Sequence, residues 1–219
     1  SSSGTASITV ASGAYTDAAE NNGGAGTTPT LTFDTAAPTL AITSDVDTLA
    51  TGDTATITFT FSEAPNGFTE SDITTVGGDL TDLAVSETDS KVYTATFTPT
   101  ASSSGTASIT VASGNYTDAA GNTGGAGVTP TLSFDTTAPT LVITSDESAL
   151  ATGDTATITF TFSETPVGFA AGDITTSGGT LSGLAVSETD TKVYTATFTP
   201  TASSSGTASI TVASGAYTD

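Results

Sequence analysis

The stretch of sequence that decides the fold is TATITFTFS, which runs from Thr54 to Ser62. Its apolar residues occupy every second position and alternate with threonines; they are Ala55, Ile57, Phe59 and Phe61. A period of two is typical of a β-strand with one buried face and one solvated face. This segment therefore predicts a strand that packs its aromatic and aliphatic side chains into a core.

Other segments complete a set of seven predicted strands. They are TLAITS from Thr39, DITT from Asp72, LTDLAVSE from Leu80, KVYTATFTP from Lys91, GTASITVAS from Gly105 and TPTLSFD from Thr129. The turn-forming sequences TGD, APNG, GG and SSSG lie between them. Seven short strands in about 100 residues is the expected size of an immunoglobulin-like β-sandwich. We therefore predict an all-β fold.

The chain is an internal tandem repeat. The sequence SSSGTASITVASG begins at Ser1, Ser102 and Ser203, so the period is 102 − 1 = 101 and again 203 − 102 = 101 residues. We predict three segments: residues 1–34 as the C-terminal part of a repeat, residues 35–135 as a complete repeat, and residues 136–219 as a repeat without its last strand. Because residues 1–17 and 203–219 are identical, we interpret the chain as part of a longer array whose final strand comes from outside.

The composition excludes several classes of function. The 219 residues contain 2 Lys+Arg against 23 Asp+Glu, a formal net charge of −21, with no His and no Cys. Such a charge repels phosphate backbones and disfavours anionic membrane surfaces, so we expect no nucleic-acid binding. No apolar run reaches about 18 residues, so we expect no membrane insertion. Thiolate and imidazole ligands are absent, and no acid, base and nucleophile set remains, so we expect no enzymatic activity.

With no His and no Cys, the side chains that could bind a metal ion are those with oxygen donors. If the strands are named A to G, acidic residues that recur in comparable copies gather at the end of the sandwich next to the linker: Asp34, Asp135, Glu63, Glu164, Asp72, Asp173, Asp118 and Asp219, with Asn122. Asp45 and Asp146 lie in the A–B loop at the opposite end. Neighbouring carboxylates repel unless a cation lies among them, and oxygen donors suit Ca²⁺. The alternative is that these are solvated loop residues, because Asp and Asn favour turns for local reasons.

The strings DTTAPTLVITSD, GDTATITFTFSE, GFAAGDI, VYTATFTPT and SGNYTDAAGN point to a family. The chain resembles the bacterial immunoglobulin-like repeats of giant surface adhesins, in particular the extender regions of RTX-type, biofilm-associated adhesins. The resemblance implies an extracellular, cell-surface location, calcium at the junctions between repeats, and calcium ligands at the linker and DAAGN positions. The first partial copy reads DAAENN, with Glu20 in place of glycine, at the corresponding candidates Asp17 and Asn21.

The expected function is a structural spacer, stiffened by Ca²⁺, whose partners are the neighbouring repeats of the same array. Two alternatives stay open. One is a self-associating filament or surface-layer subunit completed by strand exchange between chains. The other is a glycan-binding adhesin domain, which would need an aromatic-lined pocket.

Overall fold

The computed structural model describes residues 3–219; the first two residues of the predicted segment 1–34 lie outside the described part. The chain divides into two compact units, Ser1–Thr136 and Thr137–Asp219. Within residues 3–219, no helix is long and apolar enough to cross a membrane.

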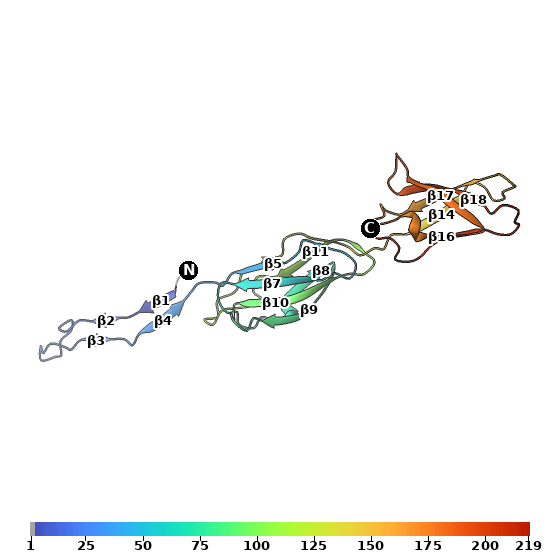
Figure 1. Cartoon of the computed structure of the whole chain (residues 1–219). Coiled ribbons are helices and arrows are strands. Elements are labelled where there is room, and N and C mark those ends of the chain that lie inside the picture. Colours follow the sequence, from blue (N-terminus) through green and yellow to red (C-terminus); the bar gives the residue numbers. More distant parts are fainter. Residues whose placement is uncertain (1–2) are drawn as a thin grey trace. The chain divides into compact units, whose positions relative to one another are not determined.

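The first unit begins with an antiparallel ribbon. Its strands are β1 (Ser3–Ala6), β2 (Thr9–Val10), β3 (Gly26–Thr27) and β4 (Leu31–Asp34). β1 pairs with β4 and β2 pairs with β3, and Figure 1 shows the two chain segments running side by side. The ribbon has no sheet stacked on it among the described residues, so its apolar side chains are exposed; they include Ile8 (65%), Leu31 (51%) and Phe33 (43%).

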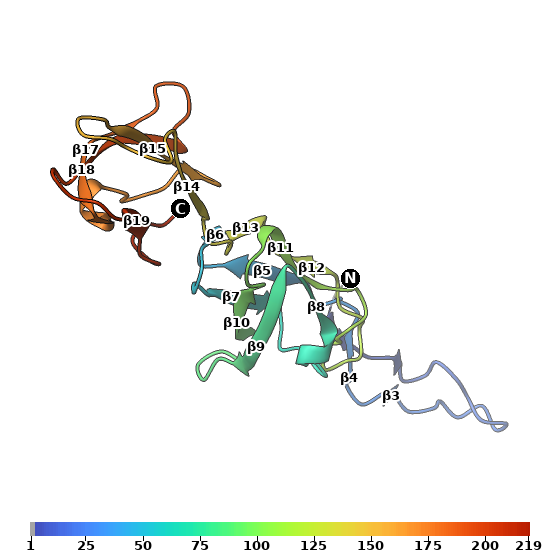
Figure 2. The same cartoon turned by 90° about the vertical axis from the view of Figure 1, so that its right-hand side faces the viewer.

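The rest of the first unit is a two-layer β-sandwich (Figures 1 and 2). One sheet is antiparallel, in the order β5 (Leu40–Ser44), β7 (Ala55–Phe61), β10 (Val92–Pro99) and β9 (Gly78–Val85). In the other sheet β11 is the central strand. Its members are β6 (Thr48–Leu49), β8 (Ile73–Val76), β11 (Ser104–Val111), β12 (Gly127–Val128) and β13 (Leu132–Asp135). A single 3₁₀ turn, η1 (Glu70–Asp72), precedes β8.

The core follows the alternation in the sequence. Every second residue of β7 is buried, and Ile57 and Phe59 are fully inaccessible to solvent. The second sheet contributes Ile109, Val111, Leu132 and Phe134 to the same cluster. Five aromatic rings pack together at one end of the core, in edge-on and tilted pairs whose ring centroids are 4.9–6.3 Å apart. They are Phe59, Phe61, Phe68, Tyr93 and Tyr116. The prediction of an all-β sandwich is therefore confirmed, with the short strands β6 and β12 as additions that the sequence did not indicate.

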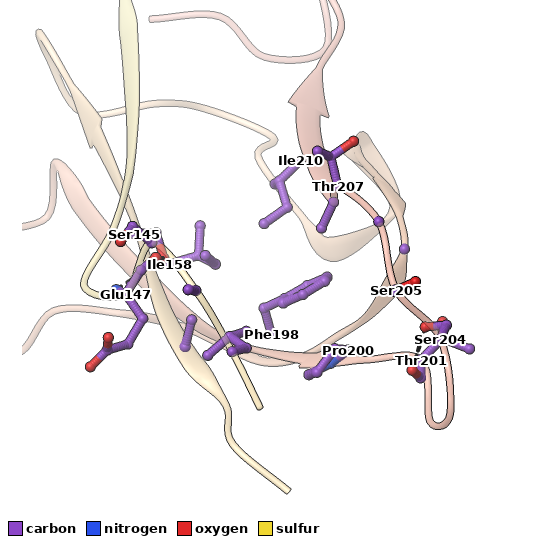
Figure 3. Close-up of a pocket in the computed structure, with 17 residues that line it drawn as sticks. Ser145, Glu147, Ile158, Phe198, Pro200, Thr201, Ser204, Ser205, Thr207 and Ile210 are labelled. Atoms are coloured by element: carbon purple, nitrogen blue, oxygen red, sulfur yellow. Dashed lines mark hydrogen bonds between the residues drawn. The ribbon is translucent and has the colours of Figure 1, made fainter. Parts of the chain in front are cut away.

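The second unit repeats most of this arrangement. Its first sheet has the order β14 (Leu141–Ser145), β15 (Ala156–Phe162), β18 (Val193–Pro200) and β17 (Gly179–Val186). Its second sheet is the pair β16 (Ile174–Ser177) and β19 (Ser209–Val212), with the 3₁₀ turn η2 (Ala171–Asp173) before β16. Counterparts of β6, β12 and β13 are absent from the described residues of this unit. A cavity of about 780 Å³ in this unit has Ile158, Phe198 and Ile210 in its lining (Figure 3).

Candidate metal site

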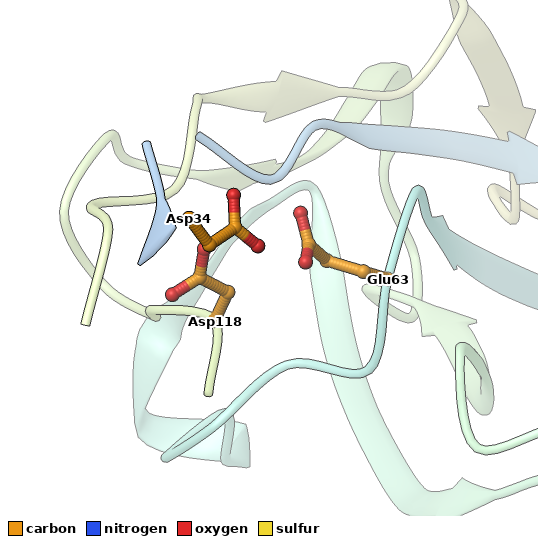
Figure 4. A group of neighbouring side chains, drawn as sticks. All are labelled: Asp34, Glu63 and Asp118. Carbon is orange, nitrogen blue, oxygen red and sulfur yellow. The ribbon is translucent and has the colours of Figure 1, made fainter. Parts of the chain in front are cut away.

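Three carboxylates from distant parts of the sequence meet in the first unit. Asp34 ends β4, Glu63 follows β7, and Asp118 lies in the loop between β11 and β12. One carboxylate oxygen from each residue lies within 4.8 Å of the others, and Figure 4 shows the three side chains close together, with those of Asp34 and Glu63 facing each other. Asp118 is buried and the other two are half-buried. These three are the sequence-predicted ligands that the fold brings together in this unit.

The loop around Asp118 holds its carboxylate rigidly. Asp118 Oδ1 accepts hydrogen bonds from the backbone amides of Ala120 (2.8 Å) and Asn122 (2.8 Å), and Oδ2 accepts one from Asn122 Nδ2 (2.6 Å). Burial acts to raise the pKa of Asp118, which is only 1% exposed, but these hydrogen bonds outweigh it and lower the pKa from its ordinary value. Asp118 is therefore held as a fixed negative charge.

Asn122 links this loop to the linker. Its amide nitrogen also donates to the backbone oxygen of Asp34 (3.2 Å). Asn122 thus donates hydrogen bonds that join two of the carboxylate-bearing segments, and its role as an oxygen ligand stays a prediction. Asp34 is itself fixed, since its Oδ1 accepts a hydrogen bond from the amide of Ala36 (2.9 Å).

The negative charges of the neighbouring aspartates repel the carboxylate of Glu63. Its pKa is raised from its ordinary value, first by partial burial and then by the negative charges of Asp118 and Asp34. The chain has only two basic residues, Lys91 and Lys192, so its own side chains offer little compensation. A divalent cation would relieve the repulsion, and the donor set suits a hard ion such as Ca²⁺.

The first partial copy keeps the loop without the three-carboxylate group. Asp17 accepts hydrogen bonds from the amide of Ala19 and from the backbone and side chain of Asn21, at 2.9–3.0 Å, as Asp118 does in the complete copy. The side-chain bond from Asn21 is the main reason that the pKa of Asp17 is lowered. Glu20 adopts a φ of 68°, the left-handed conformation that Gly121 has in the complete copy at 87°. Among residues 3–219, Asp17 belongs to no three-carboxylate cluster.

In the second unit, Glu164 and Asp219 place carboxylate oxygens within 4.8 Å of each other. They occupy the positions that Glu63 and Asp118 occupy one repeat earlier, since 164 − 63 = 101 and 219 − 118 = 101. Asp135 is the last residue of β13 in the first unit. The pairing of Glu164 with Asp219 shows that the convergence of these two loops is a property of the repeat.

Four other predicted ligands lie outside the carboxylate clusters and instead accept hydrogen bonds from backbone amides in their own units. Asp72 accepts hydrogen bonds from the amide (2.7 Å) and the hydroxyl (2.9 Å) of Thr69, and Asp173 accepts one from the amide of Ala170 (2.7 Å). These contacts shape the approach to η1 and η2. The remaining two fasten the loop after the first strand: Asp45 accepts from the amide of Thr56 (2.8 Å) and Asp146 from that of Thr157 (2.7 Å).

One residue that the sequence reasoning did not select is Tyr116. Its hydroxyl donates to the backbone oxygen of Pro38 (3.3 Å), and the amide of Gly125 donates to the same oxygen (3.0 Å). Tyr116 is 2% exposed, and burial raises the pKa of its hydroxyl. These bonds attach the linker to the sandwich beside the carboxylates. The available signal was the tyrosine of the YTD sequence, which recurs in each copy.

Comparison with known proteins identifies the repeat unit. Residues 34–134 and 135–219 each match the family described as "Bacterial Ig-like domain". Among curated proteins, none matches the chain.

Similar solved structures include FdeC, an Escherichia coli adhesin, with a TM-score of 0.44 and 13% identity over 96% of this chain and 79% of that one. InvD of Yersinia pseudotuberculosis has a TM-score of 0.31 and 22% identity, over 85% of this chain and 56% of that one. The Yersinia pseudotuberculosis adhesin InvE has a TM-score of 0.33 and 17% identity, over 74% of this chain and 51% of that one.

Proposed function

Because the chain belongs to the bacterial Ig-like domain family, with two tandem matches, we propose that it is a non-enzymatic spacer in the stalk of a bacterial surface adhesin. In this proposal the repeats act outside the cell and hold a separate binding region away from the surface. The neighbouring repeats of the same array are its partners. We further propose that it comes from the extender region of an RTX-type, biofilm-associated adhesin, which the sequence resemblance supports.

The observation that carries the proposal is the meeting of Asp34, Glu63 and Asp118. Asp34 precedes the linker, whereas the other two residues lie on loops of the sandwich. A Ca²⁺ ion bound by all three would cross-link the incoming strand to the sandwich and would remove the repulsion that raises the pKa of Glu63. Calcium would therefore reduce bending at this point of the chain.

The hydrogen bonds of the linker support the same role. Pro38 accepts from Tyr116 and Gly125, and the backbone oxygen of Asp34 accepts from Asn122. Proline further restricts the backbone. The linker is thus already hydrogen-bonded to the sandwich at Asp34 and at Pro38, so one bound cation would restrict its remaining motion. A restricted linker suits a spacer better than a flexible tether.

Calcium titration of the whole chain tests this proposal. Extracellular calcium modules bind at about 10⁻⁴–10⁻³ M, so about 10 mM Ca²⁺ would stabilise the first unit by about 1.4–2.7 kcal/mol. For a domain of this size we expect a rise of roughly 6–20 °C in its unfolding midpoint relative to chelator. Scanning calorimetry would measure the midpoint, and small-angle scattering should give a larger radius of gyration in calcium.

Matched variants locate the effect. Asp34→Asn and Glu63→Gln should remove the calcium-dependent shift, whereas Glu70→Gln, which alters an exposed acid outside the cluster, should retain it. Equal midpoints in calcium and in chelator for the unaltered chain would overturn the proposed calcium role. A shift that survives in both cluster variants would show that the ion binds elsewhere.

A further inference from the structure

The chain contains two Asn-Gly dipeptides, Asn22–Gly23 and Asn66–Gly67. Asparagine followed by glycine is prone to deamidation, because glycine has no side chain to hinder its amide nitrogen from attacking the asparagine side chain. In a folded protein the attack also requires that this nitrogen is not held in a hydrogen bond. The two dipeptides differ in this respect.

Both reacting groups of Asn66–Gly67 are free. The two residues are exposed, in the loop between β7 and η1. Among residues 3–219, neither the side chain of Asn66 nor the amide nitrogen of Gly67 has a hydrogen-bond partner. Gly67 has a φ of 79°, and beyond its chain neighbours no atom lies within 4 Å of the position that a Cβ would take. The nitrogen therefore has open space in which to move toward the side chain of Asn66.

The amide nitrogen of Gly23 is held in place. It donates a hydrogen bond to the backbone oxygen of Tyr15 (2.7 Å). Gly124, the counterpart of Gly23 because 124 − 23 = 101, donates in the same way to the backbone oxygen of Tyr116 (2.9 Å). The bond is therefore a property of this loop in both copies. Gly23 would have to give it up before it could attack Asn22.

We infer that Asn66 is a site of spontaneous deamidation. The nitrogen of Gly67 loses its proton to solvent and forms a bond to Cγ of Asn66, while the side-chain amide group takes up a proton and leaves as ammonia. Water then opens the resulting cyclic imide at either of its carbonyl groups, so the products are aspartate and isoaspartate. Water is the only co-reactant. Each product carries one negative charge more than asparagine does, and this charge acts on its surroundings as that of any other modification does.

The backbone of Asn66 joins the two loops of the sandwich that carry carboxylates. Its amide donates to the backbone oxygen of Thr117 (2.7 Å), and its own backbone oxygen accepts from the amide of Thr117 (3.2 Å). Thr117 precedes Asp118, and Asn66 lies in the same loop as Glu63. In isoaspartate the chain runs through the former side-chain carbon, which adds one backbone atom between residue 66 and Phe68. Both ends of this lengthened segment are held by the fold.

The aromatic core holds the far end of the segment. Phe68 is 8% exposed, and its ring centroid lies 4.9 Å from that of Phe61 and 5.3 Å from that of Tyr93. Because such a core is close-packed, the added atom is expected to displace the exposed bridge to Thr117 and not the ring of Phe68. Isoaspartate at residue 66 should therefore loosen the loop that holds Asp118 and destabilise the first unit, whether or not a cation is bound.

The second unit carries a natural control. Val167–Gly168 occupies the same position, since 167 − 66 = 101. Val167 forms the same two backbone hydrogen bonds, with Thr218, at 2.7 and 3.1 Å. Valine has no side-chain amide and cannot undergo the reaction. The variant Asn66→Val thus introduces a residue that the fold already accepts at this position.

Incubation of the purified chain in mildly alkaline buffer tests the site. Peptide mapping by mass spectrometry would follow deamidation at each asparagine, and isoaspartyl methyltransferase with a labelled methyl donor would measure isoaspartate. A synthetic peptide of residues 62–71 gives the rate without the fold. The attack turns the peptide group between Asn66 and Gly67 and so breaks the bond from the amide of Thr117 (3.2 Å). Loss of one such bond should make Asn66 react at most about 10-fold more slowly in the chain than in the peptide.

The same samples show whether the free nitrogen selects the site. Asn22 should react more slowly than Asn66, because the nitrogen of Gly23 is hydrogen-bonded. An Asn66 that stays intact after the peptide is fully converted would overturn the inference. So would an Asn22 that reacts as fast as Asn66.

Calorimetry in chelator tests the structural consequence. In the aged chain the unfolding midpoint of the first unit should be roughly 2–12 °C lower than in the fresh chain, the effect of losing about one hydrogen bond. The midpoint of the second unit should not change, and Asn66→Val should show no fall on ageing. An aged chain that contains isoaspartate at residue 66 but unfolds as the fresh chain does would refute the role of the bridge. An equal fall in aged Asn66→Val would show that the damage lies elsewhere.

Discussion

Replacement of Leu132 by alanine should strongly destabilise the first unit. Leu132 is fully buried in β13, and its truncation removes three carbons from the core. At about 0.8 kcal/mol per methylene the transfer loss is roughly 2.4 kcal/mol. The remaining cavity brings the expected loss in free energy of unfolding to about 3–5 kcal/mol.

Scanning calorimetry of the whole chain would measure this loss. A domain of about 100 residues loses roughly 4–8 °C of midpoint per kcal/mol, so the transition of the first unit should fall by roughly 12 °C or more. The transition of the second unit should stay in place, since Leu132 belongs to the first core cluster and not to the second.

Leu31→Ala is the matched control, since the same residue in the same local sequence is 51% exposed there. Leu31→Ala should change the free energy of unfolding by less than about 0.5 kcal/mol. If Leu132→Ala costs less than about 1 kcal/mol, or if the two variants behave alike, then β13 is not a core strand and the reasoning from burial fails.

Two further predictions concern the candidate metal site and the linker. Because the pKa of Glu63 is raised above its ordinary 4.5, this carboxyl favours the folded state below that value, and the contribution is lost as pH rises through the raised pKa. Glu63→Gln, measured in chelator at pH 7, should therefore raise the unfolding midpoint of the first unit and make that midpoint depend less on pH. A lower midpoint would contradict the proposed repulsion. Glu70→Gln is the control and should leave the midpoint unchanged. Tyr116→Phe removes the hydrogen bond to Pro38 (3.3 Å) and should cost about 0.5–1.5 kcal/mol in denaturant titration. Tyr15→Phe should be neutral because Tyr15 is 58% exposed, and equal effects in the two variants would show that the linker bond contributes nothing.

The strand content could be predicted from the sequence because alternation is a local property. The period of two in residues 54–62 requires only that one face of a strand be apolar, and every predicted inward side chain of β7 is buried. The repeat of 101 residues likewise needs no structure, since it is a comparison of letters. Together these two features were sufficient for the all-β sandwich fold.

The membership of the carboxylate cluster could be predicted only in part. Sequence position places Asp34, Glu63, Asp72 and Asp118 near the same end of a sandwich, but it does not say where a side chain points. In the structure Asp72 turns back to the amide of Thr69, whereas the other three carboxylates converge. A carboxylate can either accept a hydrogen bond from a backbone amide three residues away or turn toward a carboxylate that is distant in sequence. Only the folded backbone decides between these two orientations.

Burial was decided by tertiary structure alone. The segment SSSGTASITVASG is identical in its three copies, yet Ile8 is 65% exposed, Ile109 is fully buried, and Ile210 is half-buried beside a cavity. Ile109 and Ile210 lie in the strands β11 and β19, and Ile8 lies between β1 and β2. Whether each side chain meets a second sheet depends on residues far away in the chain, because the hydrophobic effect acts on the surface removed from water and not on the residue itself.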